Sequence, residues 1–320
     1  MNLKLIKHPE LFQGRNKTDK YFEGWYFKNV SANLKNVFSV IPGVSIDTYD
    51  KHAFIQTIIY NMDSDKIETN YHKFTINDFK YTDDPFSISI GSNKFSCNGM
   101  ELDLHANECY LHGKINFSKF TKIKTNLIFP NTMGFFAYIP FMECYHEIVS
   151  MNHNLKGSII VNEETLDFNK GKGYVEKDWG TSFPRKYIWI QSNNFKNSDA
   201  SIMCSVAHIP FLASSFNGFI CNLIVNGLEY RFASYNLSKL KLIENNNGTI
   251  KISIKKNNFI LNINGKITFS GGLLKAPKSG LMNDFIKEGL NGKVSVKLTD
   301  KSGKVLFDGT GNYCGIEVVE

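Results

Sequence analysis

Short runs of aromatic and β-branched residues recur along the chain, separated by clusters of Asn, Asp, Gly and Ser. Runs bounded in this way are typical of β-strands. The strands predicted in the first half are residues 21–30, 37–44, 53–60, 86–90, 110–117 and 157–161. Those predicted in the second half are residues 187–191, 201–207, 218–225, 249–254, 259–263, 293–298 and 316–319. The pattern therefore predicts an all-β protein.

One late segment has helical rather than strand periodicity. Leu281, Phe285, Ile286 and Leu290 would lie on one face of a helix, so a single short helix is expected over residues 281–290. Elsewhere, hairpin signals such as Asn247-Gly248 favour antiparallel pairing of consecutive strands. The expected architecture is an antiparallel barrel or sandwich, formed twice.

Length supports this duplication. A chain of 320 residues exceeds a typical single domain, and we expect two β-domains packed together, residues 1–165 and 166–320. A short echo agrees with two related halves, because an acid lies near a tryptophan both in residues 23–26 and in residues 176–179.

Charge and hydropathy exclude several classes of partner. The net charge of +7 comes from 37 Lys and Arg against 30 Asp and Glu, but the lysines are scattered, so no nucleic-acid partner is expected. The absence of a long apolar run leaves at most peripheral membrane contact. Without a secretory leader or a C-x-x-C pair, the six cysteines are interpreted as reduced thiols of a cytoplasmic protein.

Metal and nucleotide motifs are not found. His146-Glu147 resembles the start of a zinc-protease motif, but the position that requires the second histidine is Ser150. No G-x-x-x-x-G-K-S/T sequence occurs for phosphate binding. We therefore expect neither a metal nor a cofactor.

The segment GKGYVEKDWGTSFP, residues 171–184, is the most unusual in the chain. It places three ionisable residues, Glu176, Lys177 and Asp178, directly before Trp179 and between glycines. Tryptophans commonly fill β-barrel cores, and that interpretation stays open for this segment. The crowding of charge beside an aromatic ring also favours a site.

A second group of ionisable residues lies in the apolar stretch IPFMECYHEIVSMNH. If this stretch is a strand, Glu143, Tyr145 and Glu147 lie on one face and His146 on the other. Carboxyl groups among apolar side chains have raised pKa values, which is how a general acid is made.

Five segments in the same order resemble the tocopherol cyclase family over essentially the whole chain. They are YFEGWYFK (21–28), MGFFAYIPFMECYHEIVSMNHNLKGSI (133–159), GKGYVEKDWGTSFP (171–184), YIWIQSNNF (187–195) and LLKAPKSGLM (273–282). The resemblance implies a lipocalin-like doubled barrel, similar in form to carotenoid hydratases. It also implies a cofactor-independent isomerase that protonates the alkene of a prenylated hydroquinone, after which the phenol oxygen closes a chromanol ring.

The resemblance also implies roles for named residues. Glu176 or Glu143 would donate the proton and His146 would orient or relay it, while Asp178 stands where family members often carry Asn. The substrate-binding residues would be the cation-stabilising tryptophans and their neighbours: Trp25, Trp179, Trp189, Tyr26, Tyr145 and Glu23.

Two alternatives share the same sequence features. A non-catalytic lipocalin-like carrier of an apolar isoprenoid or quinol needs the cavity but no acid. The segment at residues 171–184 can also be purely structural, with Lys177 paired to Glu176 or Asp178 at the surface.

Overall fold

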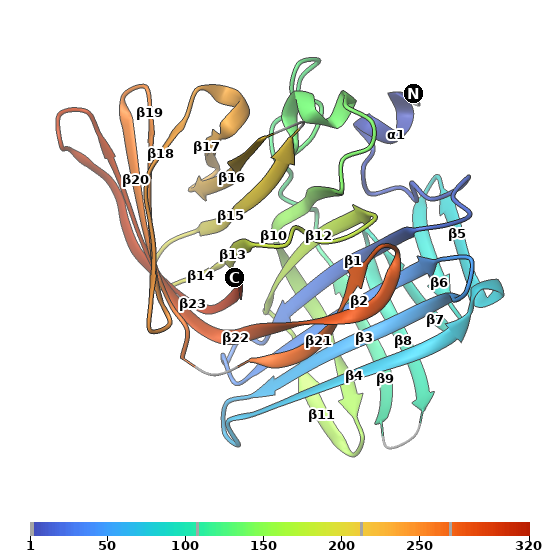
Figure 1. Ribbon diagram of the computed structural model, residues 1–320. Helices are drawn as coiled ribbons and strands as arrows, with labels where there is room; N and C mark the ends of the chain where they lie inside the picture. The colour runs from blue at the N-terminus through green and yellow to red at the C-terminus, as the bar shows by residue number, and fades with distance from the viewer. Residues whose placement is uncertain (1–2, 107–108, 212–213, 269–270) are drawn as a thin grey trace. The chain divides into compact units, whose positions relative to one another are not determined.

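The computed structural model describes residues 3–106, 109–211, 214–268 and 271–320 (Figure 1). It divides into two compact units. The first comprises Met1–Phe183 and Leu273–Phe285, and the second comprises Pro184–Gly272 and Ile286–Glu320. The chain therefore first passes from one unit to the other after Phe183 and not near residue 165, because strand β12 pairs with two strands of the first unit.

The first unit contains a 12-stranded antiparallel sheet in the order β4-β3-β2-β1-β12-β10-β9-β8-β7-β6-β5, with β11 paired to β10. The strands are β1 Tyr21–Val30, β2 Asn36–Ile46, β3 Lys51–Asn61, β4 Lys66–Thr75, β5 Phe79–Asp83, β6 Phe86–Ile90, β7 Asn93–Ser96, β8 Gly99–Ala106, β9 Cys109–Phe117, β10 Cys144–Val161, β11 Glu164–Asp167 and β12 Lys172–Gly180. Every one of these strands except β4 and β5 contributes to one buried apolar core, against which Phe74 and Phe79 from those two also pack.

The second sheet has 11 strands in the order β17-β16-β15-β13-β23-β22-β20-β19-β18, with β14 on β23 and β21 on β22. The strands are β13 Tyr187–Ser192, β14 Asn194–Phe195, β15 Ala200–Phe211, β16 Ser214–Val225, β17 Leu228–Ala233, β18 Lys239–Asn246, β19 Thr249–Lys256, β20 Phe259–Lys266, β21 Gly272–Lys278, β22 Leu281–Asp300 and β23 Val305–Val319. Buried apolar residues of every one of these strands except β18 and β21 form a separate core in the second unit.

The all-β prediction is confirmed. Among the described residues, the helical elements are α1 Leu3–Lys7 and the three 3₁₀ turns η1 Ile76–Asp78, η2 Gly134–Tyr138 and η3 Ser234–Asn236. All six cysteines are free thiols, as expected.

The helix predicted over residues 281–290 is wrong, because these residues begin strand β22. Phe285, one of its presumed apolar contacts, is 55% exposed. Glu288 and Gly289 pair with β23, and burial then alternates along the strand as a period of two requires. Gly289 and Gly292 also disfavour a helix, since glycine loses the most backbone freedom there.

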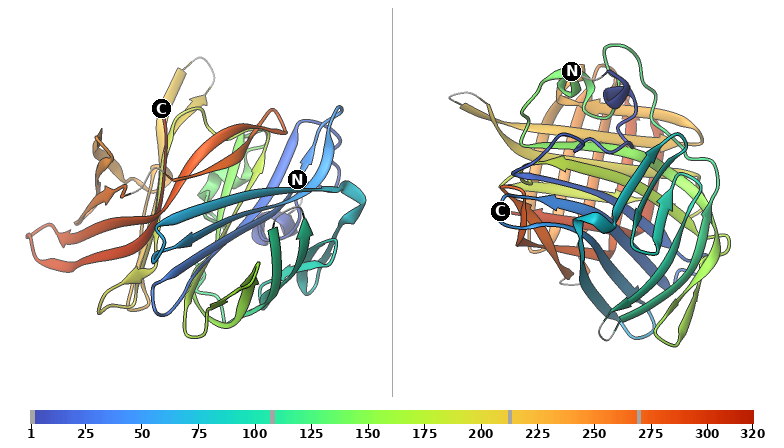
Figure 2. Two further views of the ribbon diagram at one scale, coloured as in Figure 1. Left: turned by 90° about the horizontal axis from the view of Figure 1, so that it is seen from below. Right: turned by 90° about the vertical axis from the view of Figure 1, so that its right-hand side faces the viewer.

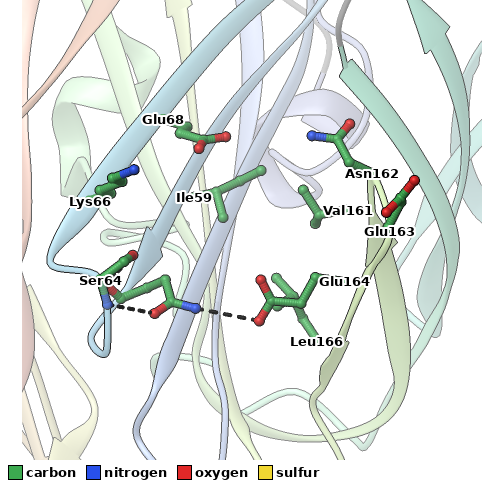
Figure 3. Close-up of a pocket in the computed structure, with 10 residues that line it drawn as sticks. Ile59, Ser64, Lys66, Glu68, Val161, Asn162, Glu163, Glu164 and Leu166 are labelled. Carbon is green, nitrogen blue, oxygen red and sulfur yellow. Dashed lines mark hydrogen bonds between the residues drawn. The ribbon is translucent and has the colours of Figure 1, made fainter.

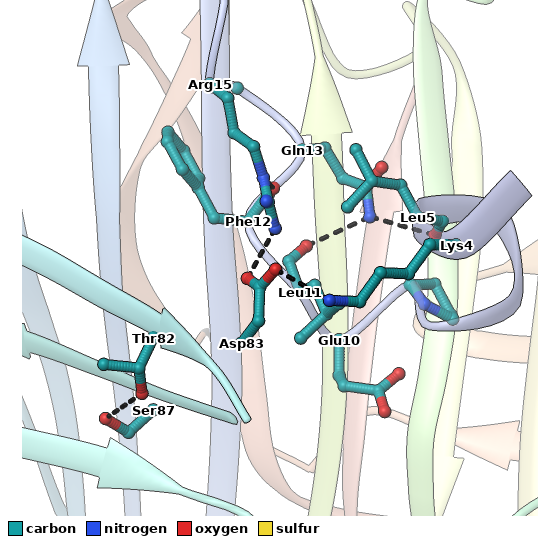
Figure 4. Close-up of polar contacts among 12 residues, drawn as sticks. Lys4, Leu5, Glu10, Leu11, Phe12, Gln13, Arg15, Thr82, Asp83 and Ser87 are labelled. Atoms are coloured by element: carbon teal, nitrogen blue, oxygen red, sulfur yellow. Dashed lines mark hydrogen bonds and ion pairs between the residues drawn. The ribbon is translucent and has the colours of Figure 1, made fainter. Parts of the chain in front are cut away.

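The N-terminal segment before β1 is held to the first unit by polar contacts (Figure 4) and by aromatic packing. Asp83 accepts bonds from Arg15 at 2.5 Å and from Lys4 at 3.1 Å. The Phe12 ring packs against Phe79 with ring centroids 5.0 Å apart. This segment therefore contributes to the core rather than extending freely into solvent.

Candidate functional site

Strand β12 divides the conspicuous charged segment between two faces of the sheet. Val175 and Trp179 belong to the apolar core, so Lys177 between them also points to the core side. Glu176 and Asp178 alternate with these residues and point to the opposite side. Because β12 lies between β1 and β10, both faces are completed by those neighbours.

On the side away from the core, His146 of β10 lies between the two carboxyl groups of β12. Its Nδ1 is 2.9 Å from Asp178 Oδ1, and its Nε2 is 3.8 Å from Glu176 Oε2. His146 and Asp178 are directly opposite across the strand pair. The Tyr174 hydroxyl donates a hydrogen bond of 2.5 Å to Glu176. We call these four residues the His146 cluster.

The charge balance of the His146 cluster favours an imidazolium. Burial lowers the pKa of His146, but the carboxylates of Asp178 and Glu176 outweigh it and raise the pKa to about 9. Burial and the Glu176 carboxylate raise the pKa of Tyr174, so its hydroxyl stays a hydrogen-bond donor. The cluster can therefore store a proton at neutral pH and exchange it between a nitrogen and a carboxyl oxygen.

The same cluster has the donor atoms for a divalent cation. One ligand atom from each of His146, Glu176 and Asp178 lies within 4.8 Å of the others. One nitrogen and two carboxylate oxygens suit a first-row transition metal. The short contact from His146 Nδ1 to Asp178 leaves Nε2 as the nitrogen for such an ion. The expectation that the protein uses no metal stays a prediction.

The core side of the same strands holds a second charged group. Lys177 Nζ lies 2.5 Å from Glu23 Oε1, and both side chains are completely buried. Tyr21 donates to the Glu23 carboxylate, as do the backbone amides of Gln13 and Gly14. A buried ion pair requires such additional bonds, because desolvation otherwise exceeds the Coulombic gain.

Aromatic rings enclose this buried pair. The Lys177 ammonium lies 4.7 Å from the centroid of the Trp25 ring and 4.9 Å from that of Trp179. Trp179 stacks on Tyr145 with centroids 5.3 Å apart. The two tryptophans therefore already stabilise a cation, the lysine, on the core side.

The structure thus separates residues that sequence reasoning expected to act together. Trp25, Trp179, Tyr145 and Glu23 lie on the core side, opposite the His146 cluster. Tyr26 lies on the cluster's side, because it is directly opposite Glu176 on β1.

Two further predicted site residues lie outside the His146 cluster. Glu143 precedes β10, and its carbonyl accepts the backbone N–H of Thr181. Trp189 belongs to β13 of the second unit and is buried.

Sequence reasoning missed two members of these groups. Tyr174 carried no motif of its own, although its position two residues before Glu176 puts both on one face of a strand. The purely structural alternative placed Lys177 at the surface with Glu176 or Asp178, and that pairing is wrong, because Lys177 is completely buried and pairs with Glu23. Its partner Glu23 is on a strand far away in sequence. The signal that the sequence did offer was the alternation of side chains along β12, which puts Lys177 on the face opposite to Glu176 and Asp178.

An open pocket of about 430 Å³ occurs elsewhere in the first unit (Figure 3). The hairpin tips β3–β4 and β10–β11 form it, with Ile59, Val161 and Leu166 as its apolar part. Asn61 links the two tips through a weak bond of 3.4 Å to Glu164. None of the residues of the His146 cluster lines this pocket.

A model of the tocopherol cyclase-like family matches residues 119–319. The chain belongs to the tocopherol cyclase-like family. The matched region includes β10, β12 and therefore all four residues of the His146 cluster. The family resemblance of the sequence is thus confirmed.

Chloroplastic proteins described as tocopherol cyclases, from Oryza sativa subsp. japonica and Zea mays, are each 25% identical to this chain over 205 and 199 residues. The matches cover 59% of this chain and 42% of each relative, so the chain spans less than half of the plant proteins.

Among solved structures, kievitone hydratase from Nectria haematococca has a TM-score of 0.54 with 12% identity, covering 97% of this chain and 93% of that one. This likeness establishes the shared fold. In the described residues, no helix is long and apolar enough to cross a bilayer.

Proposed function

We propose that this protein is an acid catalyst that protonates an isoprenoid alkene and cyclises a prenylated hydroquinone to a chromanol. The observation that carries the proposal is the position of His146 between Asp178 and Glu176, 2.9 and 3.8 Å away. Family membership supports the same chemistry, because tocopherol cyclases close such a ring.

Glu176 is the proposed proton donor. His146 has a pKa raised to about 9, which makes its imidazolium a weak acid and a poor donor to carbon. At rest Glu176 is one of the carboxylates that raise the pKa of His146, so in the proposed reaction it donates from its protonated form, reached by uptake of a proton into the cluster. A carboxylic acid is stronger than an imidazolium, and the conjugate base of Glu176 would be stabilised by the imidazolium and by the Tyr174 hydroxyl. Asp178 would hold the imidazolium through Nδ1.

The proposed reaction is balanced without a co-reactant. The Glu176 carboxyl proton is transferred to the less substituted alkene carbon, and the positive charge develops on the tertiary carbon. The neighbouring phenol oxygen then forms the new C–O bond and releases its proton to the Glu176 carboxylate. Substrate and product are isomers, and the enzyme returns to its starting state.

Tyr26 and Tyr174 are the proposed aromatic contacts of the cation. Both lie on the same side of the sheet as Glu176, Tyr26 directly opposite it on β1 and Tyr174 two residues before it on β12. Tyrosine faces attract cations through their quadrupole. This assignment replaces Trp25 and Trp179, which already enclose Lys177 on the core side.

The test is incubation of the purified protein with a prenylated hydroquinone in D₂O, followed by mass spectrometry. The cyclase is expected to give a chromanol with one deuterium bound to carbon. In Glu176→Gln, kcat should fall by roughly 10²–10⁴-fold, which is the usual contribution of a general acid. Glu143→Gln is the matched control and should retain activity, because Glu143 lies outside the cluster.

Three results would contradict the proposal. Unchanged hydroquinone recovered from a tight complex would indicate the carrier function instead. A product heavier than the substrate by one water would indicate hydration, the reaction in the name of kievitone hydratase. Full activity in Glu176→Gln would remove Glu176 from the role of donor.

A further inference from the structure

The segment between β9 and β10 exposes an unusual number of large apolar side chains. Leu127 is 76% exposed, Ile128 65%, Phe135 41% and Phe141 95%. All four occur within a stretch that contains no strand and only the short turn η2. Several large apolar side chains exposed in one segment of a folded protein indicate an interaction site.

The tip of this segment is fixed in place rather than loosely extended. The Asn126 side chain accepts the backbone N–H groups of Ile128 and Phe129 at 2.9 and 2.8 Å. The Tyr138 hydroxyl donates to the Leu127 carbonyl at 2.6 Å. These bonds hold the backbone while the side chains of Leu127 and Ile128 stay in solvent.

Phe141 is a further exposed apolar residue of the segment, outside its tip. Its backbone has φ +66°, a conformation that bulky residues rarely adopt, and its ring is almost completely exposed. No core packing compensates for this cost at such exposure. An uncommon backbone conformation that presents an aromatic ring to solvent supports a binding role.

The apolar side chains are accompanied by positive charge. Lys119, Lys122 and Lys124 precede the tip and are exposed, and no acidic residue occurs from residue 119 to 142. Lys122 also lies 3.5 Å from the Glu10 carboxylate of the N-terminal segment, a pair at the surface that leaves its ammonium in contact with solvent. Helix α1, with exposed Leu3 and Lys7, lies beside this segment (Figures 1 and 2), and Asn131 donates to the Ile6 carbonyl at 3.2 Å. Lysines next to exposed apolar side chains match the headgroups and acyl chains of an anionic bilayer.

We propose that residues 119–141, together with α1, form a docking surface for an anionic lipid bilayer. Leu127, Ile128 and Phe141 would insert into the interface between headgroups and acyl chains, while the lysines contact lipid phosphates and carboxylates. The occupant is a lipid surface because the same segment combines exposed apolar side chains with exposed lysines and contains no acidic residue. The proposal does not depend on the reaction at the His146 cluster.

The test is co-sedimentation of the full chain with phosphatidylcholine vesicles with and without about 30% phosphatidylserine. We expect binding to the anionic vesicles that weakens when NaCl rises from about 50 to about 500 mM, because salt screens the lysines. Replacing Leu127 and Ile128 together by Ser should weaken binding by at least about tenfold. Each lysine among residues 119–124 replaced by Gln should weaken it roughly fivefold.

The chain offers a closely matched control. Leu237 of the second unit is also apolar, 84% exposed and in the left-handed region at φ 65°. Asn tolerates this conformation, so Phe141→Asn and Leu237→Asn should both fold, as circular dichroism and thermal unfolding would verify. Only Phe141→Asn should weaken vesicle binding.

Other occupants would give different results. Absence of binding to either vesicle, or equal loss in Phe141→Asn and Leu237→Asn, would overturn the proposal. Light scattering would detect a dimer. A dimer that Leu127→Ser/Ile128→Ser abolishes, in a protein that does not bind vesicles, would assign the surface to a second copy of the chain and would also overturn the proposal.

Discussion

His146 Nδ1 lies 2.9 Å from Asp178 Oδ1, at positions directly opposite each other on β10 and β12. This cross-strand pair has a consequence for the protonation of the cluster, because Asp178 is the largest of the influences that raise the pKa of His146. Asp178 stands at a position where an Asn is expected in family members. Its carboxylate therefore favours the charged form of His146.

Removing this carboxylate should make His146 titrate nearer to neutrality. In Asp178→Asn we expect the His146 pKa to fall from about 9 by at least about one unit, since burial and one fewer carboxylate both favour the neutral ring. NMR titration of the imidazole protons measures this. Asp103→Asn, which removes the partner of two exposed histidines, should leave His146 unchanged.

Loss of one member of the buried ion pair should destabilise the first unit. Lys177→Met leaves the Glu23 carboxylate buried without its cation and should lower the free energy of unfolding by about 3–5 kcal/mol. Lys177→Met/Glu23→Gln should recover part of this loss in chemical denaturation. The exposed pair Lys73–Asp50 is the control, where Lys73→Met should cost less than about 1 kcal/mol. Equal effects at both sites would contradict a buried charged pair.

Gly173 should be required for packing rather than for flexibility. A Cβ at this position would lie 2.2 Å from His153 Nε2, so Gly173→Ala should destabilise the protein by about 1–3 kcal/mol. The same change in a His153→Ala background should cost clearly less, because the contact is gone. Gly24→Ala, whose Cβ would have ordinary contacts, is the control. Additive effects would exclude the clash.

His153 should limit stability in acid. Its ring lies 4.7 Å from both Phe117 and Phe120, and burial lowers its pKa from 6.5 to about 3. The unfolded chain therefore binds a proton more readily than the folded chain. The stability that this residue contributes is complete above pH 6.5 and is lost as pH falls toward about 3.

The effect can be measured by denaturant unfolding at two pH values. From pH 8 to about pH 4, wild type should lose about 3 kcal/mol more than His153→Phe. The exposed His208→Phe is the matched control and should behave as wild type. An unchanged pH dependence in His153→Phe would show that the buried ring is not the group responsible.

Much of the fold followed from the sequence, since residues 21–30 and 187–191 coincide with or lie within β1 and β13. The segment at 281–290 was misread because four apolar residues satisfied a helical period, whereas pairing with β21 and β23 made it a strand. The residue at which the chain first passes from one unit to the other, predicted near residue 165, could also not be found from the sequence. It depends on β12 pairing with β1, more than 140 residues earlier in the chain.

The sequence by itself determined the all-β class, the family and the group of residues with chemistry, because strand periodicity and local motifs are properties of neighbouring residues. Only the tertiary structure decided which of them meet. Alternation along β12 directs Glu176 and Asp178 to His146 and directs Lys177 to Glu23, on opposite sides of one sheet. That separation depends on strand register between distant segments, which no local pattern specifies.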